Sequence, residues 1–190
     1  AHLRQLVGER GNVHVHEGDC NDILLREVLP RARFENYRRA LCLLDPYGLS
    51  LEWAVMAEAG RMGSVDLFLN FPIMDMNRNA FWANPAGVDP ADLDRMTAFW
   101  GDESWKQVVY AGEQRSLFGD HQLVKTATNE QVAEAFRQRL RDHAGFKEVP
   151  KPMPMRNSKG AVVYYLFFAS QKSVAAKIAR AIFKTYGQLG

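Results

Sequence analysis

The sequence predicts an α/β protein whose core is a mostly parallel sheet covered by helices on both faces. Strand and helix patterns alternate over residues 12–71, in the order strand, helix, strand, helix, strand. Residues 40–44 are a continuous apolar run and residues 65–71 repeat the pattern, as strands buried on both faces do. Such an alternation, with right-handed crossovers, is typical of a doubly covered parallel sheet.

Composition narrows the class of protein further. The chain has 190 residues, 47% hydrophobic and 24% charged, which fits one folded domain. A net charge of +2 gives no bulk attraction to nucleic acid or to an anionic membrane, and no apolar run reaches the roughly 20 residues of a membrane span. The first ten residues lack a signal-peptide pattern, and Cys20 and Cys42 lie in or beside apolar runs, so we expect reduced thiols and a cytoplasmic protein.

The amino-terminal elements follow in order. Residues 2–9 are a short helical lead, and residues 12–16 alternate valine with histidine before a Glu-Gly-Asp turn, as a strand does. The next helix is capped by Asp19 or Asn21 and stops at Pro30.

Two strands then enclose a second helix. The strand at residues 40–44 ends abruptly in Asp-Pro-Tyr-Gly. Ser50 caps the helix that follows, which fades at Gly60 and Gly63, and the third strand at residues 65–71 is closed by a proline.

The alternation lapses over residues 73–128, which we interpret as an insertion in the same domain. A helix starts there at Asp89, with Pro90 in its first turn. The aromatic residues of the insertion form either a satellite core beneath the loop or a lid and recognition wall beside the substrate. They are Phe81, Trp82, Phe99, Trp100 and Trp105.

The core resumes at Thr128, which makes a capping box with Gln131 for a helix ending near Gly145. Residues 146–155 contain three prolines and are expected as a peripheral strand, joined by a tight turn to a last strand at residues 161–169. The sheet thus ends in an antiparallel hairpin. The final helix has two distinct faces. One carries Val174, Ile178 and Ile182, and the other carries Lys177, Arg180 and Lys184.

Polar residues follow each of the three expected strands. Because ligands bind at the carboxyl ends of strands in an open parallel sheet, Asp19, Asp45 and Asn70 are expected to gather at one rim. Pro46 fixes the backbone beside Asp45, and the ring of Tyr47 can form a wall for a planar group. A plain turn with an aspartate cap is the alternative explanation.

This succession of motifs resembles the three-Cys-motif partner proteins, which are related to class I S-adenosylmethionine-dependent methyltransferases. The resemblance rests on strand-Gly-Asp, on Asp-Pro-Tyr-Gly, on Asn-Phe-Pro followed by Met-Asn-Arg-Asn, and on residues 163–170 with the last helix. It covers nearly the whole chain. It implies a Rossmann-like sheet, S-adenosylmethionine as cofactor and a three-Cys-motif protein as partner.

The same resemblance implies roles for single residues. Asp19 would accept a hydrogen bond from the adenine amino group, and Cys20 would offer its backbone N–H to the ring. Asp45, Pro46 and Tyr47 would stand in the place of the Asp-Pro-Pro-Tyr motif of amino-methyltransferases, where they would hold an exocyclic amine toward the sulfonium methyl. The sequence has one proline where that motif has two, which removes one fixed backbone carbonyl.

Residues at and after the end of the third strand are candidates for substrate binding: Asn70, Pro72, Asn77 and Arg78. A guanidinium at that rim can clamp a phosphate or a carboxylate. The alternative is a hydrogen-bond network that fixes the loop.

The amino-terminal end departs from the class I pattern. Class I enzymes have a glycine-rich cofactor loop after their first strand and an acidic residue after their second, and Gly8 and Gly11 do not make that loop. The two missing strands would lie between those at residues 12–16 and 40–44 and would leave buried edges unpaired. We therefore expect this sequence to be the carboxyl-terminal part, or the ordered part, of a longer protein.

Other features carry weaker signals. His14 and His16 project to one face of their strand, but no suitably spaced third ligand is evident, so no metal is predicted. Basic stretches at residues 26–39 and 137–156 can neutralise nucleic-acid phosphates, although interspersed acidic residues favour a solvated surface.

Three functions are therefore compared. The first is a methyltransferase-like enzyme that uses S-adenosylmethionine on nucleic acid or protein. The second is a non-catalytic module with the same fold that binds a partner protein, and the third is a metal-dependent hydrolase based on His14, His16 and Asp19.

Overall fold

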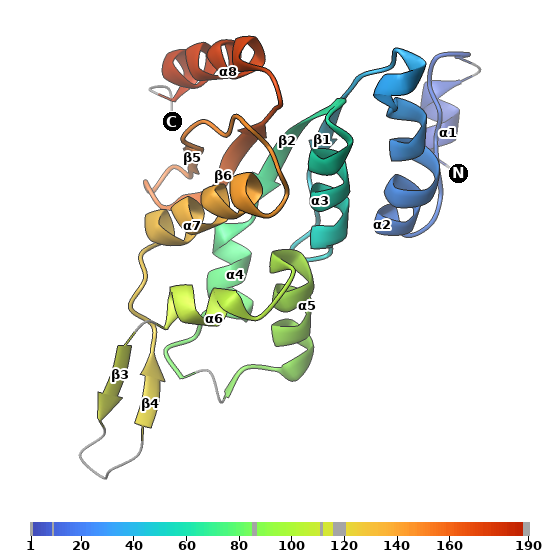
Figure 1. The fold of residues 1–190 in the computed structure, drawn as a ribbon. Helices are drawn as coiled ribbons and strands as arrows, with labels where there is room; N and C mark the ends of the chain where they lie inside the picture. Colours follow the sequence, from blue (N-terminus) through green and yellow to red (C-terminus); the bar gives the residue numbers. More distant parts are fainter. Residues whose placement is uncertain (1, 9, 85–86, 111, 116–120, 188–190) are drawn as a thin grey trace.

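A computed structural model shows a mixed α/β fold (Figure 1) and describes residues 2–8, 10–84, 87–110, 112–115 and 121–187. Within that part of the chain, a four-stranded mixed sheet has the order β1-β2-β6-β5. Its strands are β1 (Ala40–Leu44), β2 (Val65–Phe71), β5 (Met153–Arg156) and β6 (Val162–Ala169). A separate antiparallel pair consists of β3 (Gly112–Arg115) and β4 (His121–Val124).

Eight α-helices accompany the strands in the described residues. Their bounds are α1 (His2–Val7), α2 (Cys20–Ile23), α3 (Trp53–Met62), α4 (Ile73–Asn79), α5 (Pro90–Trp100), α6 (Ser104–Val109), α7 (Asn129–Asp142) and α8 (Ser173–Tyr186). After α2 the chain continues through a π-helical turn, η1 (Leu24–Val28), and two 3-10 turns, η2 (Leu29–Ala32) and η3 (Phe34–Asn36).

The pairing of the main sheet corrects one expectation and confirms another. Only β1 and β2 run parallel, while β2 with β6 and β6 with β5 run antiparallel. The sheet is therefore mixed rather than mostly parallel, because β6 inserts between β2 and β5 after a tight turn. In that turn Asn157 Oδ1 accepts from the backbone N–H groups of Lys159 and Ala161. The terminal antiparallel hairpin is confirmed, but its first strand begins at Met153 rather than at residue 146.

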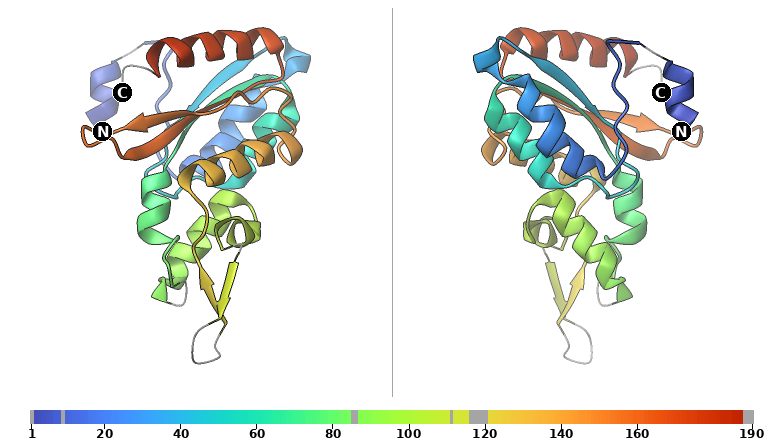
Figure 2. Two further views of the ribbon diagram at one scale, coloured as in Figure 1. Left: turned by 90° about the vertical axis from the view of Figure 1, so that its left-hand side faces the viewer. Right: turned by 90° about the vertical axis from the view of Figure 1, so that its right-hand side faces the viewer.

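Helices cover the two faces of the sheet unequally. Figure 2 shows α8 alone on one face and α3 and α7 on the other. The larger core lies on the α3 and α7 side, where the rings of Phe71 and Phe136 pack 4.7 Å apart between centroids. On the other side the ring of Phe68 packs against Phe183 of α8.

The strand expected at residues 12–16 does not form. Residues 13–17 have no regular secondary structure, and the sheet ends at β1. A strand pattern becomes a strand only where a neighbour accepts its backbone hydrogen bonds, and the described residues place no such neighbour beside this segment.

The burial predicted for β1 is also wrong on one face. Leu44 is buried, but Leu41 and Leu43 are 59% and 70% exposed. The apolar run predicts a strand that is buried on both faces. The prediction holds on the face toward α3, but no described element lies over the other face of β1.

Helix boundaries agree with the capping signals in most places. Asp19 caps α2, Asp89 caps α5 and Thr128 forms the predicted capping box for α7. Pro30 does not end its helix but lies in the first turn of η2, where its missing N–H costs no bond. Glu52, not Ser50, precedes the first turn of α3.

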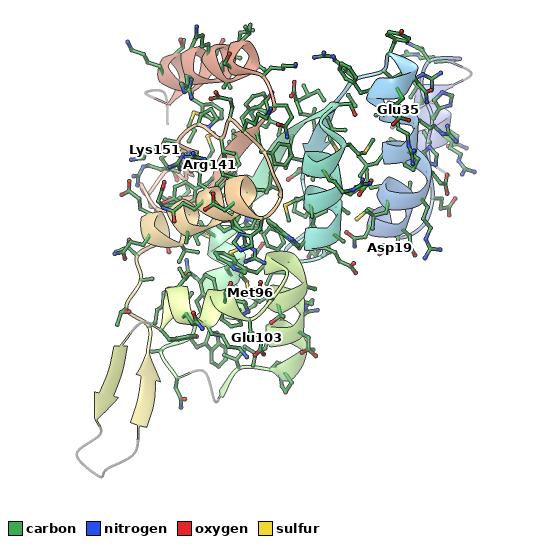
Figure 3. The ribbon with its side chains drawn as sticks, viewed as in Figure 1. Asp19, Glu35, Met96, Glu103, Arg141 and Lys151 are labelled. Atoms are coloured by element: carbon green, nitrogen blue, oxygen red, sulfur yellow. The ribbon has the colours of Figure 1, made fainter. Side chains whose placement is uncertain are left out.

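The insertion at residues 73–128 belongs to the main core rather than to a satellite. Phe81, Phe99, Trp100 and Trp105 are buried in the same cluster as the strands, whereas Trp82 is 45% exposed. Met96 of α5 lies in this cluster too (Figure 3). Part of the insertion is therefore structural. Its aromatic composition alone does not distinguish this role from that of a lid.

Candidate functional site

A cavity of about 340 Å³ opens at the carboxyl end of β1 and is here named the β1 cavity. Its walls come from the segment leading into α2 and η1 and from β1 with the loop that follows it. The lining residues are His16, Gly18, Cys20, Ile23, Leu24, Leu43, Leu44, Asp45, Pro46 and Leu51. Leucine and isoleucine form half of this lining, and Asp45 brings a carboxylate to it. Such a mixture is common in small-molecule sites.

Asn21 ties the two walls of the β1 cavity together. Its Nδ2 donates to the carbonyl oxygen of Ser50, and its Oδ1 accepts from the backbone N–H of Glu52, both at 2.9 Å. The residue is 6% exposed. Because both polar ends of this buried amide are satisfied by the loop after β1, Asn21 fixes that loop against the start of α2.

Asp45 and Asn70 meet at the ends of the two parallel strands. The side-chain amide of Asn70 donates to Asp45 Oδ1, with 2.6 Å between the nitrogen and the oxygen. Asn70 Oδ1 is buried and has no hydrogen-bond partner among the described residues. The expected gathering of these two residues at one rim is confirmed, and the rim holds an unsatisfied acceptor.

The residues after Asp45 turn away from this contact. Pro46 lines the β1 cavity, and Gly48 adopts a φ of 57°, which favours glycine. Tyr47 is 96% exposed and is not among the lining residues. In this arrangement its ring is not a wall of the cavity.

Asp19 lies at the start of α2 (Figure 3), where it has a structural task. Its Oδ1 accepts from the backbone N–H groups of Asn21 and Asp22, at 2.9 Å and 3.1 Å. This leaves Oδ2 without a capping role. Cys20, the next residue, is exposed and lines the β1 cavity.

His16 joins the site from the unpaired amino-terminal segment. Its Nδ1 lies 2.9 Å from Glu27 Oε2, which holds that segment to η1. Among the described residues, no group of three or more His, Cys, Asp or Glu is placed to hold a metal ion.

The remaining substrate-binding candidates lie on or just before α4. Pro72 is buried and precedes the first turn of α4. Asn77 donates to Asn129 Oδ1 at 2.9 Å and accepts from Lys125 Nζ, so its amide is already used in a loop-fixing network. Arg78 is exposed and lies 3.8 Å from Asp75.

Lys125 is the group in this network that sequence reasoning missed. Its ammonium lies 5.7 Å from the ring centroid of Phe81, and desolvation by burial lowers the pKa of its side chain. No motif marks this residue, because its environment depends on a contact 48 positions away along the chain.

The sequence marks Asn21 only as a possible cap, and the packing that makes it a link between two walls has no local sequence signal. Gly18, Ile23, Leu24 and Leu51 are ordinary apolar or small residues whose place in the cavity follows from the fold alone.

Comparisons of the chain with protein-family models, with curated proteins and with solved structures gave no match. No helix in the described residues is both long and apolar enough to cross a membrane.

Proposed function

We propose that the chain is a class I methyltransferase-like domain that binds S-adenosylmethionine and uses the β1 cavity for the adenine part of the cofactor. The observation that carries the proposal is the β1 cavity itself. It brings Cys20 from one wall together with Asp45 and Pro46 from the other. The sequence resemblance assigns these residues to cofactor and methyl-transfer roles.

The sheet supports the same proposal. A parallel pair, β1 and β2, is followed by an antiparallel strand that pairs directly with β2. A Rossmann-like sheet that ends in an antiparallel hairpin is the architecture that the resemblance implies.

The residues present fit one half of the cofactor. Ile23, Leu24 and Leu51 offer apolar walls for a planar base. Asp19 is not among the lining residues, but it precedes the lining residue Cys20, and the hydrogen bonds of its cap use Oδ1 rather than Oδ2. The methionine half would require donors from a glycine-rich loop, which residues 1–190 do not contain. The proposal therefore concerns adenine recognition.

The bound cofactor supplies an electrophilic methyl group on a sulfonium. In this proposal Asp45 orients an acceptor amine through Oδ2, since Asn70 donates to its Oδ1. Asn70 Oδ1, buried and without a partner among the described residues, can accept a second hydrogen bond from that amine. Two acceptors that hold an amine in one orientation lower the entropic part of the barrier.

The experiment is cofactor binding measured in two independent ways. Calorimetric titration with S-adenosylmethionine is expected to show saturable binding, and bound cofactor is expected to slow iodoacetamide modification of Cys20. Cys42 is the internal control, because burial raises the pKa of its thiol and keeps it slow to react with or without the cofactor.

Three variants separate binding from fold. Asp19→Asn keeps a good helix cap and removes the charge, so affinity should fall by about 1.5 to 3 kcal/mol with little change in stability. Asp19→Ala also removes the cap. Asp45→Asn should preserve binding and slow methyl transfer. A folded protein that gives no binding heat and no protection of Cys20 would refute the proposal.

A second function, a non-catalytic module that binds a partner protein, is favoured by one observation. Apolar side chains of β1 and α8 that face the same side of the sheet are exposed. This surface shares Leu43 with the β1 cavity.

A further inference from the structure

A second cavity lies between α7 and the hairpin of β5 and β6, and is here named the hairpin cavity. Its volume is about 190 Å³, which is room for about six water molecules or one small organic molecule. Glu130, Ala133 and Glu134 line it from α7, and Tyr165 lines it from β6. The hairpin cavity shares no lining residue with the β1 cavity, so it is a separate site.

Tyr165 is buried in the wall of the hairpin cavity and its hydroxyl is unpaired. The residue is 6% exposed. It pairs in register with Phe71 of β2 and with Pro154 of β5, so its ring points to the side of the sheet that α7 covers. Among the described residues, no group forms a hydrogen bond with the Tyr165 hydroxyl. A buried hydroxyl without a partner is unfavourable, and a polar atom of a ligand would supply the missing bond.

The charges around this hydroxyl keep it protonated. Burial raises the pKa of the Tyr165 phenol, and the charge of Glu130 adds to the rise, while Arg156 and Lys151 oppose it. The phenol therefore retains its proton at neutral pH and is able to donate a hydrogen bond to an anionic oxygen.

The two carboxylates of the lining already have basic partners. Glu130 Oε1 lies 2.7 Å from Nζ of Lys151, which is labelled beside α7 in Figure 3. Glu134 accepts from Nε and Nη2 of Arg137, at 2.8 Å and 2.6 Å. Because both negative charges are balanced by direct contacts, neither carboxylate calls for a cationic ligand.

Arg156 is different, since no carboxylate among the described residues pairs with it. Its Nη1 donates to the carbonyl oxygen of Gly160 at 2.8 Å, which leaves Nε and Nη2 for another acceptor. Ala133, Pro152 and Pro154 make the apolar part of the lining, and the two prolines have no backbone N–H. The cavity thus combines an apolar surface with a guanidinium and a phenol that are free to donate.

We propose that the hairpin cavity binds a small organic carboxylate with an apolar body. One carboxylate oxygen accepts from the Tyr165 hydroxyl and the other from the free edge of the Arg156 guanidinium, whose planar donors match a carboxylate. The apolar body lies against Ala133, Pro152 and Pro154. A cationic molecule of the same shape is rejected, because it would meet the unbalanced charge of Arg156 and two carboxylates that already have partners.

The test uses three probes of nearly the same shape and different charge: benzoate, benzamide and benzamidine. Binding is followed by NMR titration of the isotopically labelled chain. Benzoate is expected to bind about tenfold more tightly than uncharged benzamide, and cationic benzamidine no more tightly than benzamide. A nuclear Overhauser contact between the benzoate ring and the Ala133 methyl group is expected to locate the probe. Absence of benzoate binding, or benzamidine that binds as tightly as benzoate, would overturn the proposal.

Two variants test the proposed donors. Arg156→Gln should weaken benzoate about tenfold, because it removes a charged donor, and Tyr165→Phe should weaken it about threefold or more. Arg31→Gln, exposed in η2, and Tyr164→Phe, on the opposite face of β6, are the matched controls and should leave the affinity unchanged. Benzoate affinity that is the same in Arg156→Gln and Tyr165→Phe as in the original chain would overturn the assignment.

Thermal unfolding gives a readout that does not need a measured affinity. Without benzoate, Tyr165→Phe should be at least as stable as the original chain, because it removes a buried hydroxyl that has no partner. Benzoate should raise the melting temperature of the original chain more than that of Tyr165→Phe. A variant that is clearly destabilised without benzoate would show that the hydroxyl already has a partner and would contradict the proposal. None of these measurements involves S-adenosylmethionine, so they are independent of the proposed enzymatic function.

Discussion

Asn21 accepts the backbone N–H of Glu52 at 2.9 Å and thereby joins the two walls of the β1 cavity. The same side chain donates to the carbonyl oxygen of Ser50, so it has a partner at each end. Glu52 precedes the first turn of α3, and Asn21 lies in the first turn of α2. The relative position of two helices, and with it the shape of the cavity, thus depends on one buried amide.

Replacing that amide should loosen the cavity and destabilise the fold. Asn21→Ala leaves the Glu52 N–H and the Ser50 carbonyl without their partner, which should lower the free energy of unfolding by about 1–3 kcal/mol. Urea denaturation measures the change. Asn36→Ala, at an exposed position in η3, is the control and should differ by less than about 0.5 kcal/mol. A similar small effect at Asn21 would show that the link is not needed.

A buried arginine fastens the insertion to α7. Arg139 is 8% exposed and lies 4.7 Å from the ring centroid of Trp53, and it donates to the backbone oxygen of Trp100 and to Asp102 Oδ2, each at 2.6 Å. Partial burial raises the pKa of Asp102, but hydrogen bonds from Ser104 and Arg139 outweigh it and lower that pKa to about 2.

This low pKa predicts a pH-dependent contribution to stability. The folded pKa is below the value of an unfolded chain, so the carboxylate stabilises the fold above about pH 4 and loses this effect as the pH falls toward 2. Asp102→Asn should therefore destabilise the fold at pH 7 and lower its melting temperature. The loss in the free energy of unfolding should be less than about 1 kcal/mol, because the Asp102 side chain is half exposed. The difference should vanish near pH 2. Asp142→Asn, on the exposed side of α7, is the control.

The role of the insertion at residues 73–128 is better tested by point substitutions than by a deletion. Removing residues 83–112 would be expected to spare the fold if the insertion were only a lid, but this stretch contains the buried rings of Phe99, Trp100 and Trp105. Trp105→Ala should cost about 3–5 kcal/mol, since the ring is fully buried and its Nε1 donates to Thr97 Oγ1. Trp82→Ala, half exposed, should cost far less. Thermal unfolding compares them, and equal losses would contradict this division.

The features that the sequence predicts correctly are those that depend on residues close together along the chain. The caps at Asp89 and Thr128 are predicted, and Asp19 is one of two candidates for its helix, because a side-chain oxygen needs only its own helix to act as a cap. The position of Asp45 and Asn70 at one rim is predicted because the carboxyl ends of parallel strands lie together, whereas their direct hydrogen bond is a finding of the structure.

Features that depend on neighbours could not be read in the same way. Residues 12–16 have a strand pattern, and Leu41 and Leu43 belong to an apolar run that is typical of buried strands. Whether such a segment pairs or is buried depends on which other elements lie beside it, and the local pattern carries no information on that. The apolar face predicted for α8 is real, but it faces outward. These departures border the same uncovered side of β1, as a sheet with an open edge would produce.

The contact between Asp45 and Asn70 can be tested by placing a second carboxylate at the end of β2. Asn70→Asp would place a second carboxylate within hydrogen-bond distance of Asp45, where the amide nitrogen now lies at 2.6 Å. Two adjacent carboxylates raise the pKa of the pair above its unfolded value. The folded state then binds more protons than the unfolded chain, so its stability falls as the pH rises through that pKa.

The Asn70→Asp variant should therefore be less stable than the original chain at pH 7, by about 1 kcal/mol because Asp45 is exposed, and should recover as the pH approaches 4. Urea denaturation at several pH values measures this. Exchanging the two residues, with Asp45→Asn and Asn70→Asp together, restores one amide facing one carboxylate and should remove most of the deficit at pH 7. A deficit that is the same at every pH, or that persists in the exchanged variant, would show that charge repulsion at this rim is not its cause.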